Sequence, residues 1–352
     1  MPTTALTIGN ELLSTTMHIL MKEWRDNVHE STAFLDASER VHGAGQPSQA
    51  GGTRIVIPLG FEDHSSTTRL RTGYERIDLS VEDVFKPAVY SWAHVVRPVA
   101  ISSEEEMINQ GDAAVLSILE NRVTMTANAL KREFVKQIVQ GGVAGWEDWG
   151  TLNGVDAAAT GSADGFLEEN AVGAQGNTVG GVSKSTYSSK TGWQNQRFDG
   201  AGSFNANGLA GLYDLKVEIA SVSPNGDPNV ILASRAGFKN LKRSLQAHER
   251  YVDQGKIDGG RLVEYWDGVQ INVERNMPDA GATTGAGDPI SFYMLNMNDI
   301  HCLWDPKGYF DLSDFETVSG EYDVRAAKIR VRGQLIAKHL GSSGIGFDLE
   351  TF

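Results

Sequence analysis

The tetrapeptide WEDW, residues 146–149, places two carboxylates between two aromatic rings. A pair of carboxylates can act as general acid and general base in glycoside hydrolysis. Glu147 and Asp148 are therefore the candidate catalytic residues of a hydrolase. Adjacent residues in a loop have no fixed separation, however, and no other aromatic residues cluster nearby in the sequence. The favoured interpretation is a packed loop that caps the preceding helix.

Histidine and cysteine residues give no second catalytic pattern. The eight histidines are scattered, and none form the i, i+4 pair that is typical of a helical metal site. Cys302 is the single cysteine, which excludes an intrachain disulfide and a cysteine-based zinc site. His301 precedes it in a strand-like run, so the two side chains would point to opposite faces. We expect Cys302 in the core, and we expect no metal and no cofactor.

The run GNTVGGVSKS, residues 176–185, is the nearest approach to a phosphate-binding loop. A Walker motif needs lysine and then serine or threonine directly after its second glycine. Val182 and Ser183 stand there instead. The pattern predicts a flexible polar loop.

Length and charge limit the class of protein. The chain has 352 residues, 40% of them hydrophobic, and a formal net charge of −14. This length allows two domains or one domain with long extensions, and the acidic balance argues against gripping nucleic acid phosphates as a main task. The N-terminus carries no secretory signal, so we expect a protein made in the cytoplasm with no membrane role.

The longest regular pattern runs from Gly111 to Gly142, with Asp112 at the position of an N-cap. Apolar residues recur at steps of three or four, which predicts one helix of roughly 40 Å at about 1.5 Å per residue. The residues of this apolar face are Leu116, Leu119, Val123, Ala127, Leu130, Phe134 and Ile138. Such a face needs a broad partner that covers it.

Basic residues gather on this helix and on a predicted long strand near the C-terminus, RAAKIRVRGQLIAKHL. In an acidic protein they are local exceptions. A solvated face or a set of ion pairs is the favoured interpretation, and contact with packaged DNA or with acidic neighbouring subunits is the alternative. The residues concerned are Arg122, Lys131, Arg132 and Lys136 on the helix, and Arg325, Lys328, Arg330, Arg332 and Lys338 on the strand.

The rest of the chain mixes helices and strands in separate runs, which is typical of an α+β protein. An amphipathic helix around residues 12–28 has little nearby sequence to pack against. Alternating runs at 53–61 and 74–81, joined by a polar tip, predict a long hairpin. The composition of residues 142–185 predicts a glycine-rich loop. Further on, the patterns predict a helix at 207–222, a strand VILAS, a helix through Phe238, a hairpin at Asp267–Gly268, and strands ISFYMLN and IHCLW.

This order of an arm, a long hairpin, a lone long helix and a mixed body resembles the major capsid proteins of tailed phages, which share the Hong Kong 97 fold. The runs GWEDWGTLNG, VGGVSKSTYSSKTGWQNQ and PNVILASRAGFKNLKRSLQAHERYVDQG are similar to segments of that family. The resemblance implies an N-terminal arm at 1–50, an E-loop at 51–86, and a P domain at 87–150 and 318–352 with its spine helix at 111–140. It also implies a glycine-rich loop or insertion at 151–208 and an A domain at 209–317.

The resemblance further implies function through assembly. Identical subunits would form the hexamers and pentamers of an icosahedral phage head that encloses double-stranded DNA. Scaffolding, portal and decoration proteins would be its partners. The protein would reside in the virion and would not be an enzyme. Intersubunit contacts are expected at Leu13, Met17, Trp24, Arg54, Glu62, Asp63, Arg69 and Arg71. Residues that face DNA or neighbouring subunits are expected among Arg122, Lys131, Arg132, Lys136, Arg330 and Arg332.

The sequence departs from the family in two respects. Some members cross-link their shells through an E-loop lysine, but residues 51–85 contain arginines and no lysine, so we expect no cross-link by that route. Many members also carry a cleaved N-terminal scaffolding segment, whereas Met1 here opens almost directly onto the arm. A separate scaffolding protein, or a leader missing from this sequence, is the expectation.

Two alternatives stay open. An encapsulin-like nanocompartment would use the same fold to enclose an enzyme cargo, although no cargo-peptide pocket can be identified in the sequence. A hydrolase that uses Glu147 and Asp148 is the second alternative, from a different class.

Overall fold

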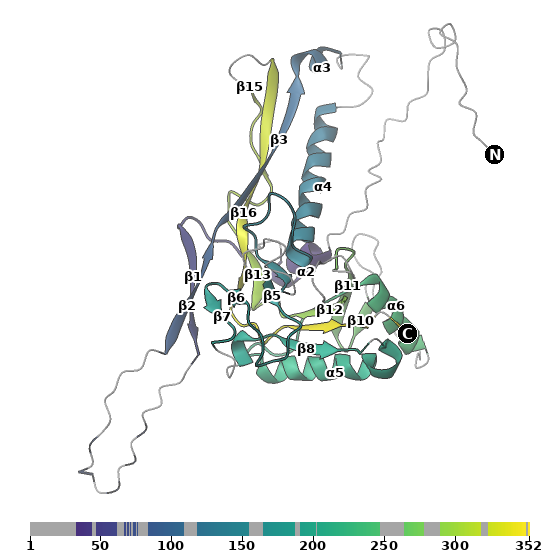
Figure 1. The fold of residues 1–352 in the computed structure, drawn as a ribbon. Coiled ribbons are helices and arrows are strands. Elements are labelled where there is room, and N and C mark those ends of the chain that lie inside the picture. The colour runs from purple at the N-terminus through teal and green to yellow at the C-terminus, as the bar shows by residue number, and fades with distance from the viewer. Residues whose placement is uncertain are drawn as a thin grey trace, which may run out of the picture.

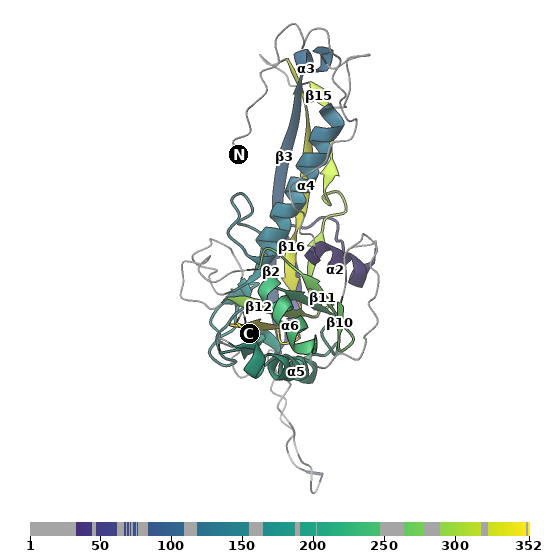
Figure 2. The ribbon, with the colours of Figure 1, turned by 90° about the vertical axis from the view of Figure 1, so that its right-hand side faces the viewer.

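The computed structural model describes residues 33–43, 47–61, 67, 69, 71, 73–74, 76, 84–108, 118–154, 165–186, 191–201, 203–246, 264–277, 289–317, 323–349 and 351–352. Figures 1 and 2 show a broad body, a long spine that rises from it, and a hairpin beside the body. The predicted helix at residues 12–28 lies outside the described residues.

The body is built on a six-stranded sheet in the order β10-β11-β9-β12-β17-β8. Successive side chains of a strand point to opposite faces of this sheet. Ile231 and Ala233 pack with two helices on one face, whereas Val230 and Leu232 belong to the main core on the other. The strands are β8 (Gln196–Asp199), β9 (Val230–Ala233), β10 (Glu264–Trp266), β11 (Val269–Val273), β12 (Ile290–Leu295) and β17 (Gly344–Phe347). The helices are α5 (Phe204–Val222) and α6 (Arg235–Gln246). These elements confirm the helices and strands predicted in this part of the chain.

Local chemistry explains where these elements begin and turn. Ser203 caps α5, because its side chain accepts a hydrogen bond from the Ala206 N–H. Asp267 and Gly268 have φ angles of 49° and 79°, the positive values that a tight two-residue hairpin requires. The predicted hairpin at Asp267–Gly268 is therefore confirmed as β10 and β11.

The spine consists of an antiparallel pair, β3 (Ala93–Ser102) and β16 (Val324–Ala337), with α4 (Ile118–Val139) along one face. Figure 2 shows the three elements running together away from the body, with α3 (Ser103–Ile108) at the tip. Three shorter strands also pair with β16: β13 (Ile300–Trp304), β14 (Asp311–Leu312) and β15 (Glu316–Thr317). The predicted long helix is confirmed over 118–139, and residues 109–117 lie outside the described residues.

The strand β16 alternates as predicted, because Ala327, Ile329 and Val331 are buried while Lys328 and Arg330 are exposed. On α4, Leu130 and Phe134 are fully buried. The covered face of the long helix therefore lies against the sheet of its own chain, and its broad partner is β3 with β16.

The hairpin beside the body pairs β1 (Arg54–Gly60) with β2 (Phe85–Ser91) in antiparallel register, with Ile55 opposite Tyr90 and Gly60 opposite Phe85. The sequence predicted residues 74–81 as the second strand. Most of those residues lie outside the described ones, and the observed partner of β1 is the next apolar run along the chain.

The prediction of a loop between residues 142 and 185 holds for most of the described residues of this segment, but the segment also contains short strands. It forms β4 (Thr151–Asn153) paired with β5 (Gly165–Leu167), and the run predicted as a flexible polar loop is a hairpin of β6 (Thr178–Val179) and β7 (Val182–Ser183). A short 3-10 helix, η2 (Thr191–Trp193), follows. Phe166 and Trp193 are buried, so the segment belongs to the core.

The sequence analysis predicts no helix at α2 (Ala33–His42), which packs Phe34, Leu35 and Ala37 into the main core. The segment after it also binds the body, because the Gln49 N–H donates to the Trp304 carbonyl at 2.9 Å. The second part of the predicted arm is thus part of the body.

Candidate functional site

The two tryptophans of WEDW are buried and its two carboxylates are exposed. Phe134 of α4 lies 5.7 Å from Trp146 and 5.0 Å from Trp149 between ring centroids. The segment therefore caps the end of α4, which confirms the favoured interpretation. Buried rings cannot serve as a sugar platform.

The electrostatics of Glu147 also oppose acid catalysis. Its carboxylate accepts a hydrogen bond of 2.9 Å from the Gly145 N–H. That bond stabilises the charged form and lowers the pKa of Glu147. A general acid at neutral pH needs a raised pKa.

His301 and Cys302 lie in β13, and both are buried. Burial raises the pKa of the Cys302 thiol, so this residue is a small core side chain, as predicted. The His301 ring contacts His42 of α2 at 5.3 Å between centroids. Desolvation by burial, with Lys338 and His42 nearby, lowers the pKa of His301 to about 4. Among the described residues, no three His, Cys, Asp or Glu side chains group as metal ligands.

Several basic residues predicted to face DNA or neighbouring subunits have partners within the chain. Arg122 forms two hydrogen bonds with the Glu105 carboxylate, at 2.7 and 2.8 Å. The ammonium of Lys131 lies 5.8 Å from the centroid of the Phe310 ring. For Arg122 the ion-pair interpretation of the sequence therefore holds. Arg132 also interacts within the chain, and Lys136 is exposed.

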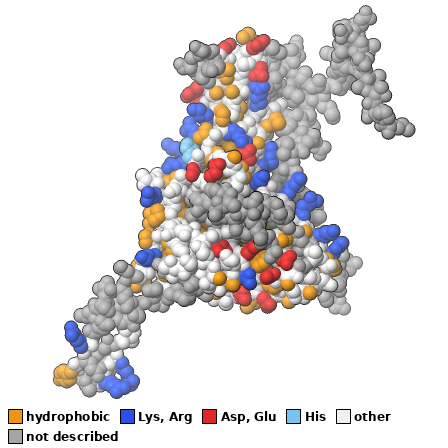
Figure 3. Space-filling model, viewed as in Figure 1, with side chains coloured by type: hydrophobic (Ala, Val, Ile, Leu, Met, Phe, Trp, Pro, Cys, Tyr) orange, Lys and Arg blue, Asp and Glu red, His pale blue; other side chains and the backbone are white. Residues whose placement is uncertain are grey.

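On β16 the basic residues divide in the same way. Arg332 pairs with Asp305 at 2.6 Å, and its guanidinium lies 5.0 Å from the Trp92 ring. Arg330 and Lys328 are exposed, opposite Val96 and Pro98 of β3. Figure 3 shows basic side chains along the spine and acidic ones near its tip.

The β1–β2 hairpin presents an apolar outer face. Ile55 and Tyr90 point into the core, so their neighbours in the register point outward. Two residues on this outer face are Val56, 57% exposed, and Phe85, 71% exposed. Arg54 at its end is exposed, as are Arg69 and Arg71 in the segment between the strands. The other predicted contacts, Leu13, Met17, Trp24, Glu62 and Asp63, lie outside the described residues.

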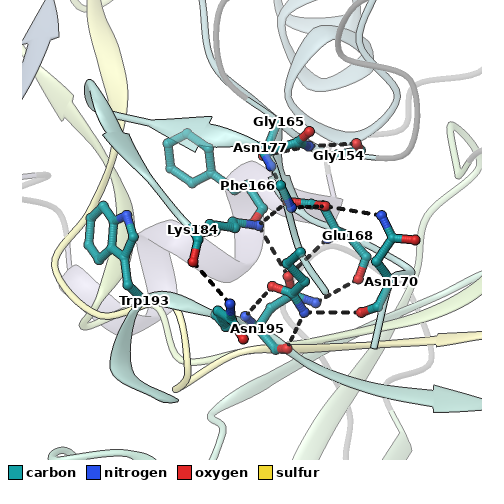
Figure 4. Close-up of polar contacts among 12 residues, drawn as sticks. Gly154, Gly165, Phe166, Glu168, Asn170, Asn177, Lys184, Trp193 and Asn195 are labelled. Atoms are coloured by element: carbon teal, nitrogen blue, oxygen red, sulfur yellow. Dashed lines mark hydrogen bonds and ion pairs between the residues drawn. The ribbon is translucent and has the colours of Figure 1, made fainter. Parts of the chain in front are cut away.

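A polar cluster centred on Lys184 was missed by the sequence analysis (Figure 4). Lys184 is fully buried, and its ammonium donates to the Phe166 carbonyl at 2.6 Å and to Asn195 Oδ1 at 3.2 Å. Glu168 Oε1 lies 3.2 Å from the same nitrogen. The available signal was the run WQNQ, residues 193–196, in which three polar residues follow a tryptophan. The hydrogen-bond partners of Asn195 in this run lie up to 27 residues away in the sequence.

This combination of spine, sheet-and-helix body and projecting hairpin is similar to the folds of solved phage capsid chains, which confirms the predicted α+β Hong Kong 97-like fold class. No protein-family model matches the sequence, and no curated protein matches it. Among solved structures, a chain of the cyanophage A-1(L) capsid asymmetric unit is similar with a TM-score of 0.64 and 15% identity, covering 97% of this chain and 100% of that one.

Two further solved structures are similar over nearly the whole chain. The capsid of the native GTA particle has a TM-score of 0.59 and 13% identity, covering 98% of each chain. The holo-SrpI encapsulin complex from Synechococcus elongatus PCC 7942 has a TM-score of 0.55 and 10% identity, covering 98% of this chain and 97% of that one. At these identities the comparisons establish the fold.

Proposed function

We propose that the chain is the major capsid protein of a tailed phage, a structural shell subunit that assembles with copies of itself. The observation that carries the proposal is the outer face of the β1–β2 hairpin. A two-stranded ribbon is marginal in water, and the outer face of this one exposes Val56 and Phe85, with the exposed pair Pro58 and Pro87 between them. A contiguous exposed apolar face of this kind is typical of an interaction site.

The predicted division of the chain belongs to this proposal. The E-loop at 51–86 contains β1 and the start of β2, and the P domain at 87–150 and 318–352 contains the rest of β2 and the spine. The A domain at 209–317 contains most of α5 and all of α6. The arm at 1–50 would reach a neighbour with residues that precede α2. The described residues of the proposed insertion at 151–208 include the buried side chains of Phe166 and Trp193.

The proposal entails assembly into hexamers and pentamers, which form an icosahedral head that holds double-stranded DNA. The exposed Lys328 and Arg330 of the spine support an acidic partner, either DNA or a neighbouring subunit. Scaffolding, portal and decoration proteins are proposed partners, and the virion is the proposed location. None of the helices in the described ranges has the length and hydropathy that a bilayer span requires.

Assembly is tested at Phe85 by comparing two variants. Phe85→Asp places a charge on the outer face of the hairpin, so we expect subunits that fold normally but form no shells in electron micrographs. Phe85→Leu keeps an apolar side chain and should form shells. Because the residue is exposed in the single chain, both variants should unfold at the wild-type denaturant midpoint. Normal shells from Phe85→Asp would contradict an intersubunit role for this face.

An encapsulin-like compartment is the second candidate, supported by the similarity to the SrpI encapsulin. The content of purified particles separates the two candidates. Genome-length DNA in the particles supports the phage head, whereas a protein cargo without such DNA supports the compartment.

A further inference from the structure

The Lys184 cluster brings an amine, a carboxamide and a carboxylate together in the core. Lys184 comes from the end of the β6–β7 hairpin, Asn195 precedes β8, and Glu168 follows β5. Lys184 and Asn195 have no exposed surface, and Glu168 has 3%. Figure 4 shows the three side chains converging beside Phe166 and Trp193.

We propose that Lys184 Nζ and the side chain of Asn195 condense to form an intrachain amide bond, with Glu168 as the proton carrier. The reaction releases one ammonia molecule and needs no oxidant and no cofactor. The inference does not depend on the proposed shell function, because it concerns bonds within one folded chain.

Positioning supports the reaction, because the reacting groups are already in contact. Nζ lies 3.2 Å from Asn195 Oδ1. Two reactants that are held in a fixed core behave as if at very high concentration, which lowers the entropic part of the barrier. Attack requires the carboxamide to turn until its carbon faces Nζ.

The environment activates both partners. Burial lowers the pKa of Lys184 to about 8, so a neutral, nucleophilic amine is accessible at ordinary pH. The Glu168 N–H donates to Asn195 Oδ1 at 2.9 Å, where it would stabilise the negative charge that develops on this oxygen during attack.

The protons balance through Glu168. Its carboxylate, 3.2 Å from Nζ, accepts a proton from the ammonium, which frees the lone pair. Nζ attacks the Asn195 carbonyl carbon, and the tetrahedral adduct collapses with cleavage of the bond from this carbon to Nδ2. Nζ keeps one of the three protons of the ammonium. The other two, one of them carried by Glu168, leave with Nδ2 as ammonium. Glu168 therefore ends the reaction as a carboxylate.

The cluster can hold the product, in which Lys184 has lost its charge and Glu168 remains a carboxylate. That carboxylate keeps the hydrogen bonds from the Gly176 and Asn177 N–H groups, at 3.0 and 2.8 Å, which offset the loss of the ammonium. The aromatic side chains around the site exclude the water that would hydrolyse the new bond. The ion pair of Lys216 with Asp267 lacks this shielding from water, because the Asp267 side chain is 46% exposed.

Mass spectrometry of the intact wild-type chain tests the proposal. We expect a mass lower than the sequence mass by one ammonia. Trypsin normally cuts after Lys184, Lys190 and Arg197, which gives peptides 137–184, 185–190 and 191–197. With the bond present, Lys184 is not cut, and peptide 137–190 stays joined to peptide 191–197 as a branched species.

Three variants sharpen the test. Lys184→Arg and Glu168→Gln should show the full sequence mass, because one lacks the nucleophile and the other the proton acceptor. Lys216→Arg leaves the cluster intact and should keep the deficit of one ammonia. The wild-type result decides the question even if a core variant fails to fold.

Two results would overturn the proposal. The full sequence mass in the wild type, with three separate tryptic peptides, would show that the cluster is a noncovalent ion pair. A loss of ammonia with Lys184 still cut would indicate a succinimide at an Asn-Gly step, such as Asn225-Gly226, and would also refute the bond.

Discussion

Acid should destabilise the subunit through His301, and the size of the effect follows from its burial. The pKa of this ring is lowered from 6.5 to about 4, chiefly by desolvation, with Lys338 and His42 as further causes. The folded protein therefore binds this proton less readily than the unfolded chain does. Its contribution to stability is complete above pH 6.5 and is lost as the pH falls towards 4.

The change in pKa sets the magnitude. One pKa unit corresponds to about 1.4 kcal/mol, so His301 alone should remove about 3 kcal/mol from the free energy of unfolding across this pH range. Burial also lowers the pKa values of His42 and His339, which adds in the same direction. Residues from α2, β13 and the end of β16 meet at this site.

The assay is urea unfolding of the subunit at several pH values between 6.5 and about 4. His301→Phe keeps a planar ring but binds no proton, so its free energy of unfolding should fall less with acid than that of the wild type, by about 3 kcal/mol over the range. His94→Phe replaces an exposed histidine of β3 and should keep the wild-type dependence. Equal acid dependence in the wild type and His301→Phe would refute the reasoning.

Three further substitutions probe the packing and the WEDW segment. Gly211→Ala should lower the free energy of unfolding, measured in urea, by about 1–3 kcal/mol, because the new Cβ would overlap the Phe198 ring. A Cβ at Gly176 meets no atom within 4 Å, so Gly176→Ala should leave this free energy nearly unchanged. Phe134→Ala should lower the free energy of unfolding by about 3–5 kcal/mol, because the ring is fully buried among aromatic side chains. Met125→Ala, at an exposed site on the same helix, should change this free energy by less than about 0.5 kcal/mol. A cost for Phe134→Ala as small as that for Met125→Ala would contradict the packing described for α4. Glu147→Gln with Asp148→Asn should leave shells unchanged in electron micrographs, and a hydrolytic turnover that this pair of changes abolished would revive the hydrolase alternative.

The parts of the fold that the sequence predicted correctly are those with a local repeat. The strand β16 is half buried, so Ile329 and Val331 alternate with basic residues and reveal both the strand and its inner face. The helix α4 shows its covered face in the spacing of Leu130 and Phe134. The Asp267–Gly268 turn needs two positive φ angles, which few residue pairs tolerate.

The parts that the sequence did not predict depend on distant partners. The outer face of the hairpin pairs Val56 with Val89, and only the register shows that this apolar row points away from the body. Nothing in the spacing of α2 indicates that Phe34 reaches the main core, because ten residues give too short a periodic pattern. The candidate contacts of the arm likewise stay predictions.

The insertion shows why composition misled the sequence analysis. Its glycine-rich and polar residues are typical of loops, since a polar group in the core is costly unless it is hydrogen-bonded. Here each of the three Lys184 N–H bonds finds an acceptor, and Glu168 also receives the Gly176 and Asn177 N–H groups at 3.0 and 2.8 Å. These partners are brought together only by the folded chain. A polar segment can therefore be core when its partners come from several short strands, and neither residue type nor period signals it beforehand.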